Sequence, residues 1–189
     1  HAPTVAIDPA IMSPHNAARH ALIPIAGDMQ LLSTDNKARL LSDSMATFAQ
    51  ATTPLNQDVA RILSNPSLVK KGFPKNTWFT VNSTASVRVR SALCDANVGS
   101  PIRTVETALF ARGSLGLIAV EGPSRNPNLH DLFAIFYDYA RQTPEAGTLL
   151  DEDEERTLIR TLVGEGCGSV TMRMSDSRLA IFASGMGEY

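Results

Sequence analysis

The sequence predicts a mainly α-helical protein. We expect a single helical domain over residues 13–183 with a few short strands or a terminal β-hairpin, an extended N-terminal arm over residues 1–12, and a loose C-terminal tail over residues 184–189. Apolar residues recur at helical spacing along much of the chain, and capping residues with prolines mark where these segments begin. Hydrophobic residues make up 43% of the 189 residues, which suffices for a packed core, and no linker or repeat divides the chain.

The clearest helix is expected between Asn128 and about Gln142. Its apolar residues follow at spacings of three and four and therefore share one side: Leu129, Leu132, Phe133, Phe136 and Ala140. Ile135 and the neighbouring tyrosines widen this side, so we expect a central helix with Phe133 and Phe136 buried. Asn128 is a suitable N-cap, and Pro144 prevents continuation.

A second helix is expected to follow, with the acidic run 151–155 in its first turn, where anions complement the helix dipole. Leu158, Ile159, Leu162 and Val163 would form its buried side, and Gly164 would end it. The alternative is that the acidic run binds a metal ion or a basic partner.

The N-terminal half contains three further expected helices. Residues 1–7 are read as an extended arm, and Ser13-Pro14 opens a short helix to Leu22. Caps at 33–35 precede a longer helix to about Gln50, and a third helix lies near 57–64, before Pro66.

The middle of the chain mixes signals. Residues 78–81 predict a short strand, and residues 85–93 fit a helix or a strand, with the helix favoured. Ser100-Pro101 opens an expected helix that closes at Gly113 and buries Ile102, Val105, Leu109 and Phe110. The apolar run 115–120 is a buried strand or a continuation of that helix. Near the C-terminus, 170–174 and 179–183 are expected to pair as a hairpin.

Charge and composition exclude several functional classes. A formal net charge of −2 argues against a DNA-binding module that needs a strongly cationic face, and no stretch approaches a membrane span or a signal peptide. The cations are uneven, because thirteen are Arg and four are Lys. Arg favours bidentate phosphate contacts and buried ion pairs, although a compositional bias explains the excess equally well. Cys94 and Cys167 permit one disulfide without requiring it.

Two groups of residues are candidates for nucleic-acid binding. Lys70, Lys71 and Lys75 surround Phe73 and precede Trp78, a combination of cations and aromatic rings that suits phosphate contact with base stacking. A cluster of arginines follows in a Ser/Thr/Asn-rich region, as a groove that binds backbone phosphates requires: Arg88, Arg90, Arg103 and Arg112. The alternatives are a solvated loop and arginines paired with acids on the surface.

Catalytic chemistry has weaker signals. Cys167 lies in the glycine-rich run 164–168 and would act as a nucleophile if a histidine such as His130 folded beside it. A structural cysteine in a turn is the simpler interpretation. The four histidines lack the spacing of metal ligands, and no phosphate-binding or hydrolase motif is present. We therefore assign no catalytic residue, no metal and no cofactor.

The aromatic run Phe133–Tyr139, followed by a break at Thr143-Pro144 and another helix, resembles the C-terminal core of coat proteins from flexible filamentous plant viruses. The resemblance covers roughly thirty residues. It implies a mainly helical protein that wraps single-stranded RNA in a groove and polymerises through extended arms.

We therefore expect a self-assembling viral coat or nucleocapsid protein that packages single-stranded RNA through an arginine-lined groove. Its partners would be single-stranded RNA and other copies of itself, not a membrane, and it would occur in the virion or the host cytoplasm. The alternatives are a small enzyme with Cys167 as nucleophile and a protein-interaction module such as an effector or scaffold.

Overall fold

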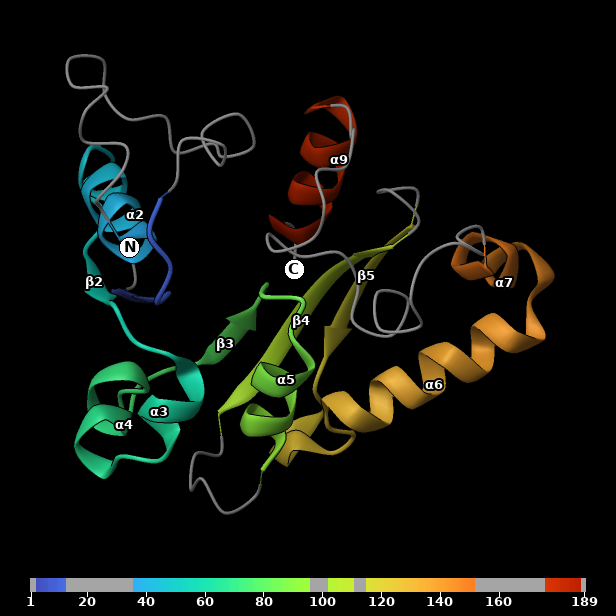
Figure 1. Ribbon diagram of the computed structural model, residues 1–189, viewed down its shortest axis with the longest axis horizontal. Helices are drawn as coiled ribbons and strands as arrows, with labels where there is room; N and C mark the ends of the chain where they lie inside the picture. The colour runs from blue at the N-terminus through green and yellow to red at the C-terminus, as the bar shows by residue number, and fades with distance from the viewer. Residues whose placement is uncertain (1–2, 13–35, 96–101, 111–114, 152–175, 188–189) are drawn as a thin grey trace. The chain divides into compact units, whose positions relative to one another are not determined.

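The computed structural model describes residues 3–12, 36–95, 102–110, 115–151 and 176–187. The chain divides into two compact units, His1–Lys75 and Asn76–Tyr189 (Figure 1). The described residues include two β-sheets, of two and three strands, beside the helices. The expectation of a mainly α-helical fold is therefore wrong, because strands occupy central positions in both units.

The first unit is built on two parallel strands, β1 (Thr4–Ile7) and β2 (Thr52–Leu55). Helix α2 (Lys37–Ala46) lies between them in sequence and packs against both. Strand β1 falls in the segment expected to be an N-terminal arm, and it pairs within its own chain.

Asn36 joins the start of the chain to α2. Its side-chain oxygen accepts the backbone N–H groups of Ala38 and Arg39, which caps the helix. Its Nδ2 donates to the carbonyl oxygens of Asp8 and Ala10 at 2.8 and 3.0 Å. The expected caps at 33–35 lie outside the described residues. Asn36 alone both caps α2 and bonds the N-terminal segment.

Two short helices complete this unit. Helix α3 (Val59–Leu63) confirms the helix expected near 57–64, and Asp58 caps it. Helix α4 (Pro66–Gly72) was not expected, because Pro66 was read only as an end. Pro66 instead occupies the first helical position behind the Asn65 cap, where a missing backbone N–H costs nothing.

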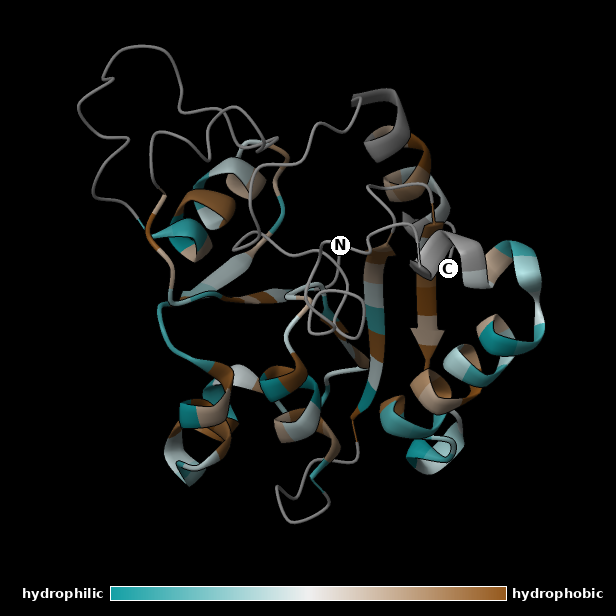
Figure 2. Cartoon of the chain, turned by 45° about the vertical axis from the view of Figure 1, so that its right-hand side comes forward, coloured by the Kyte–Doolittle hydropathy of each residue, from teal (hydrophilic) through white to brown (hydrophobic). Residues whose placement is uncertain are grey.

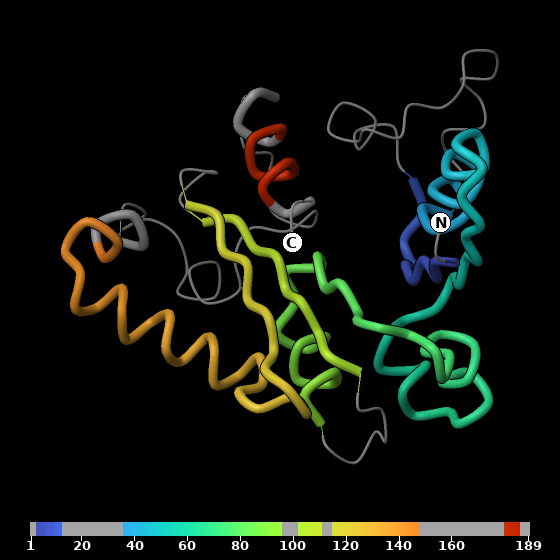
Figure 3. The backbone as a smooth tube through the Cα atoms, turned by 180° about the vertical axis from the view of Figure 1, so that it is seen from behind, coloured from blue at the N-terminus to red at the C-terminus, as the bar shows by residue number. Residues whose placement is uncertain are grey.

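The second unit is built on a three-stranded sheet in the order β3-β4-β5: β3 (Phe79–Asn82), β4 (Arg103–Phe110) and β5 (Leu115–Val120). Strand β3 runs parallel to β4, and β5 runs antiparallel to it. The tube in Figure 3 shows β4 and β5 side by side along their length. Strand β3 confirms the short strand expected near Trp78, and helix α5 (Val87–Cys94) confirms the helix favoured for 85–93.

The expected helix between Ser100 and Gly113 is wrong, because Arg103–Phe110 is strand β4. Its buried residues alternate strictly and are Thr104, Glu106, Ala108 and Phe110. Two of these four are polar, so the apolar alternation of a half-buried strand is not visible in the sequence. The apolar run 115–120 is a strand, which was one of the two interpretations.

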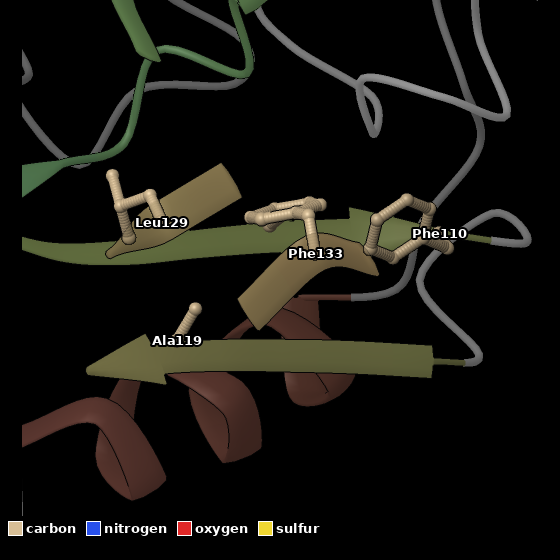
Figure 4. Close-up of a cluster of buried hydrophobic side chains, with 5 residues drawn as sticks. Phe110, Ala119, Leu129 and Phe133 are labelled. Carbon is tan, nitrogen blue, oxygen red and sulfur yellow. The ribbon is translucent and has the colours of Figure 1, made fainter. Parts of the chain in front are cut away.

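Helix α6 (Leu129–Gln142) covers one face of this sheet and confirms the clearest sequence prediction. Asn128 and Asp131 form a capping box at its start. Figure 4 shows Leu129 and Phe133 of α6 beside Phe110 and Ala119 of the strands. These four side chains form the core with Ala108, and all five are buried. Phe133 is buried as predicted, whereas Phe136 is half-buried and packs against the core from its edge.

Two helices follow α6 in the described residues. Helix α7 (Pro144–Asp151) begins at Pro144, the residue that prevents α6 from continuing. The remaining acidic residues and the apolar side of the expected second helix (152–163) lie outside the described residues. Helix α9 (Asp176–Gly187) occupies the second arm of the expected terminal hairpin, so that hairpin is wrong. A short apolar run such as 179–183 fits a strand and a helix equally well in sequence.

We expect Phe133→Ala to reduce the free energy of unfolding by about 3–5 kcal/mol, because the ring lies at the centre of the core and its loss leaves a cavity. Urea denaturation followed by circular dichroism measures this change. Ile135→Ala is the matched control on the same helix, since Ile135 is 60% exposed and should change stability by less than about 0.5 kcal/mol. Equal losses in both variants would contradict the proposed core.

Candidate nucleic-acid interface

The two faces of the β3-β4-β5 sheet have different environments. Side chains alternate between the faces, and paired residues share a face. The covered face, beneath α6, contains Thr80, Asn82, Thr104, Glu106, Ala108, Phe110, Leu115, Leu117 and Ala119. The open face contains Phe79, Val81, Arg103, Val105, Thr107, Leu109, Gly116, Ile118 and Val120. Figure 2 shows that β5 is hydrophobic over most of its length, although α6 covers only one of its sides.

Helix α9 contacts one end of the open face. A Cβ atom added to Gly116 would lie 2.4 Å from Cδ1 of Phe182, so this ring rests directly on the β5 backbone. The other end remains exposed. The exposed patch consists of Phe79, Val81, Arg103 and Val120 at this end of the open face, together with the exposed ring of Trp78, which directly precedes β3 and lies outside the alternation of its faces.

The exposed patch combines aromatic rings with one cation. The exposed fractions of Trp78 and Phe79 are 87% and 51%, although large aromatic residues are usually buried. Phe79 pairs with Arg103 in the register of β3 and β4, so the ring and the guanidinium start from neighbouring positions on one face. None of the nine sheet residues of the open face is acidic, and the patch therefore presents apolar surface with a positive charge.

Arg103 is held in place by the main chain. Its Nε and Nη2 donate to the carbonyl oxygen of Glu121 at 3.0 and 2.7 Å. A carbonyl oxygen orients the guanidinium without neutralising its charge. The exposed residue Arg103 therefore retains both its charge and further N–H donors for an anion.

A fully buried carboxylate fixes that carbonyl. Glu121 Oε2 accepts the backbone N–H of Thr104 at 2.9 Å, and Oε1 accepts that of Leu129 at 3.1 Å. Arg125 donates to both oxygens, at 2.9 and 3.2 Å, and also bonds the carbonyl oxygen of Leu93. Glu121 thus joins the end of β5 to β4, to the start of α6 and, through Arg125, to the end of α5.

The turn after Glu121, which brings the Arg125 side chain back to the Glu121 carboxylate, has an unusual backbone conformation. Ser124 and Arg125 adopt φ angles of 54° and 61°, in the left-handed region that side chains other than glycine seldom enter. Gly122 begins the turn, and a Cβ atom there would lie 1.9 Å from the carbonyl oxygen of Asn126. The conformation therefore requires glycine at 122, and the bonds of Arg125 to Glu121 hold its other end.

A second buried ion pair lies under the covered face. Nε and Nη2 of Arg90 approach Oε1 of Glu106 at 2.9 and 2.5 Å, and Asn82 Nδ2 donates to Oε2 at 2.8 Å. The Arg90 guanidinium also lies over the ring of Phe133, 3.3 Å from its centre. Arg90 and Glu106 have exposed fractions of 4% and 0%, so Arg90 supports the fold and is not presented to a ligand.

Three titrating groups near these networks have pKa values above their usual ones. The hydrogen bond to Glu121 holds the pKa of Arg125 above its usual value. Burial raises the pKa of the free Cys94 thiol, an effect that the backbone N–H of His130 partly opposes. Burial also raises the pKa of Tyr137 to about 12, with Glu106 adding to the shift and Arg90 opposing it. The thiol and the phenol are therefore both kept neutral, which makes neither an activated nucleophile.

The structure brings together only some of the residues predicted to bind RNA. Arg103 lies on the open face, and Trp78 is exposed directly before β3. Arg88 is exposed on α5, two positions from the buried Arg90 and hence on a different side of that helix. Lys70, Lys71 and Lys75 are exposed in the first unit, and Arg112 lies outside the described residues.

Sequence reasoning missed Phe79 and Val81 as site residues. The strand near Trp78 was expected, but which of its faces would be open was not. Apolar residues on both sides of a strand are visible in the sequence. They do not show which side a helix covers, so the open face can be identified only once the covering helix is known.

The other candidates from the sequence remain untested by the fold. Cys167 and its glycine-rich run lie outside the described residues. Within the described ranges, no cluster of three or more His, Cys, Asp or Glu side chains has the arrangement to hold a metal ion. None of the helices described is both long enough and apolar enough to cross a membrane.

We expect Arg90→Ala to reduce the free energy of unfolding by about 3–5 kcal/mol, because it leaves the Glu106 carboxylate buried and unpaired. Arg141→Ala is the matched control, since the Arg141–Asp138 pair is exposed and contributes at most about 1 kcal/mol. Chemical denaturation of both variants tests the difference. Replacing Arg90 would consequently disturb the fold, so this substitution does not isolate an effect on RNA binding.

The Tyr137 shift predicts how stability changes at alkaline pH. The native phenol retains its proton up to a pKa of about 12, whereas the unfolded phenol loses it near the usual 10.0. Between these values the unfolded state binds fewer protons, so stability falls as pH rises through this range. Tyr137→Phe should flatten this part of the stability profile, measured by denaturation at each pH. An unchanged profile would contradict the shift.

No protein family, no curated protein and no solved structure that was compared with this chain matches it.

Proposed function

We propose that this protein is a structural, non-catalytic binder of single-stranded RNA, and that the exposed patch of the second unit is its contact surface. The observation that carries the proposal is the pairing of Phe79 with Arg103 on an open sheet face, next to the exposed Trp78. The proposal replaces the expected arginine-lined groove by an aromatic surface with a single positioned arginine.

The chemistry of the patch fits an unpaired strand better than a duplex. Unstacked bases of single-stranded RNA pack on exposed aromatic rings, and a sheet face is a common platform for such stacking. Stacking is tolerant of sequence, because every base has a π-face. Arg103 then supplies a phosphate contact that positions the strand without reading its sequence. A duplex would offer its phosphates but not its base faces, so the rings would remain without a partner.

The same proposal accommodates the resemblance to filamentous plant virus coat proteins. A coat subunit contacts only a few nucleotides, so a small patch and a net charge of −2 are compatible with that role. In this role the protein would assemble with other copies of itself around RNA, in the virion or the host cytoplasm. Support for the coat function comes from the patch, whereas the mainly helical fold that the resemblance implies is not the fold of this chain, because both units contain a sheet.

We expect Trp78→Ala to weaken binding of a fluorescein-labelled oligouridine by about fivefold to 150-fold, from the loss of about 1–3 kcal/mol of stacking. Arg103→Gln should make the dependence of log affinity on log salt shallower by about 0.7, the value for one phosphate contact. Fluorescence anisotropy at several salt concentrations measures both effects on the full chain.

Two control variants make the same kinds of change, aromatic residue to Ala and Arg to Gln, at residues outside the patch. Tyr139→Ala removes another exposed aromatic ring, and Arg141→Gln removes another exposed cation, both from α6. Each should bind oligouridine as the parent does. If the parent fails to bind at any salt concentration, or if Tyr139→Ala weakens binding as much as Trp78→Ala, the proposal is wrong. Binding by a protein partner alone would favour the interaction-module alternative.

A further inference from the structure

The outer edge of strand β3 lacks the charges, prolines and bulges that commonly prevent strands from pairing between molecules. Within the described ranges β3 pairs only with β4, so its other edge carries backbone groups without a neighbouring strand. Natural edge strands are protected by charged side chains, prolines, bulges or a very short length. The four β3 residues, Phe79-Thr80-Val81-Asn82, include no charge and no proline, and the register with β4 runs without a bulge, so a short length is the one of these four protections that β3 has.

The side chains of this edge are apolar where they meet solvent. Phe79 and Val81 are 51% and 56% exposed and lie on the same face, two residues apart. The opposite edge strand, β5, differs, because its residues are half-buried or buried except Val120 at its end. The β3 edge is therefore the more exposed of the two edges of this sheet.

We propose that two copies of this chain pair through their β3 edges and form a continuous sheet across a two-fold axis. Two edge strands related by such an axis run antiparallel, so each backbone satisfies its partner without any further element. Phe79 and Val81 of one copy then lie beside the same residues of the other, which removes apolar surface from water. The edge carries no charge and the chain carries a net charge of only −2, so like copies meet little electrostatic repulsion.

This pairing uses the backbone edge of β3, whereas the RNA contact proposed above uses the sheet face. The two are therefore separable, and the pairing does not depend on RNA. A two-fold pair would also place two exposed patches next to each other on one enlarged open face.

Analytical ultracentrifugation of the nucleic-acid-free full chain over the micromolar range tests the pairing. The average mass should rise with concentration from the 20.3 kDa of one chain towards twice that value. Val81→Lys should abolish this rise, because it introduces paired like charges at the edge. Ile135→Lys is the matched control, since it places the same charge at a residue of similar exposure on α6, and it should associate as the parent does.

Hydrogen exchange of the parent protein provides a measurement that needs no variant. The β3 amides that β4 does not bond should exchange more slowly as concentration rises, and amides of α6 should not change. A parent that stays monomeric, association that Val81→Lys leaves intact, or β3 exchange independent of concentration would each overturn the pairing. Oligouridine binding by a monomeric parent would leave the proposed function intact and refute only the pairing.

Discussion

The ion pair between Arg90 and Glu106 is the interaction on which the second unit depends. It joins α5 to β4, extends to β3 through Asn82, and contacts α6 through the ring of Phe133. A carboxylate with no exposed surface is tolerated only when its oxygens are fully bonded, and here three donors serve two oxygens. The pair therefore restricts how the sheet and its covering helices can assemble, because any shift of one element leaves a buried charge without its partner.

Glu121 provides a second restriction of the same kind at the end of β5. Its carboxylate is also fully buried, and its bonds reach β4, the first turn of α6 and the Arg125 turn. The carbonyl of the same residue orients Arg103 towards the open face. One residue thus links the interior of the sheet to its surface, and the position of the surface cation follows from bonds made in the core.

The contrast between the two faces of the sheet explains where a ligand has access. The covered face is closed by aliphatic and aromatic side chains of α6, and its polar residues are satisfied internally. The open face meets α9 at Gly116 and is exposed at the β3 end. Exposed apolar surface of this kind usually marks an interaction site in a folded protein. The RNA contact and the pairing of copies are both located at this end, one on the face and one on the edge.

The sequence by itself determined the helices whose signals are local. Helix α6 has apolar residues at helical spacing behind the Asn128 cap, and α3 and α5 follow from similar patterns, because capping and periodicity act within a few residues. Strand β4 and the roles of the arginines were decided only by the tertiary structure. Glu106 is acceptable on a buried face only because Arg90, from a distant part of the chain, bonds its carboxylate. Arg90 and Arg103 look alike in the sequence, yet one is buried in an ion pair and the other lies at the surface, since their partners are set by packing rather than by spacing.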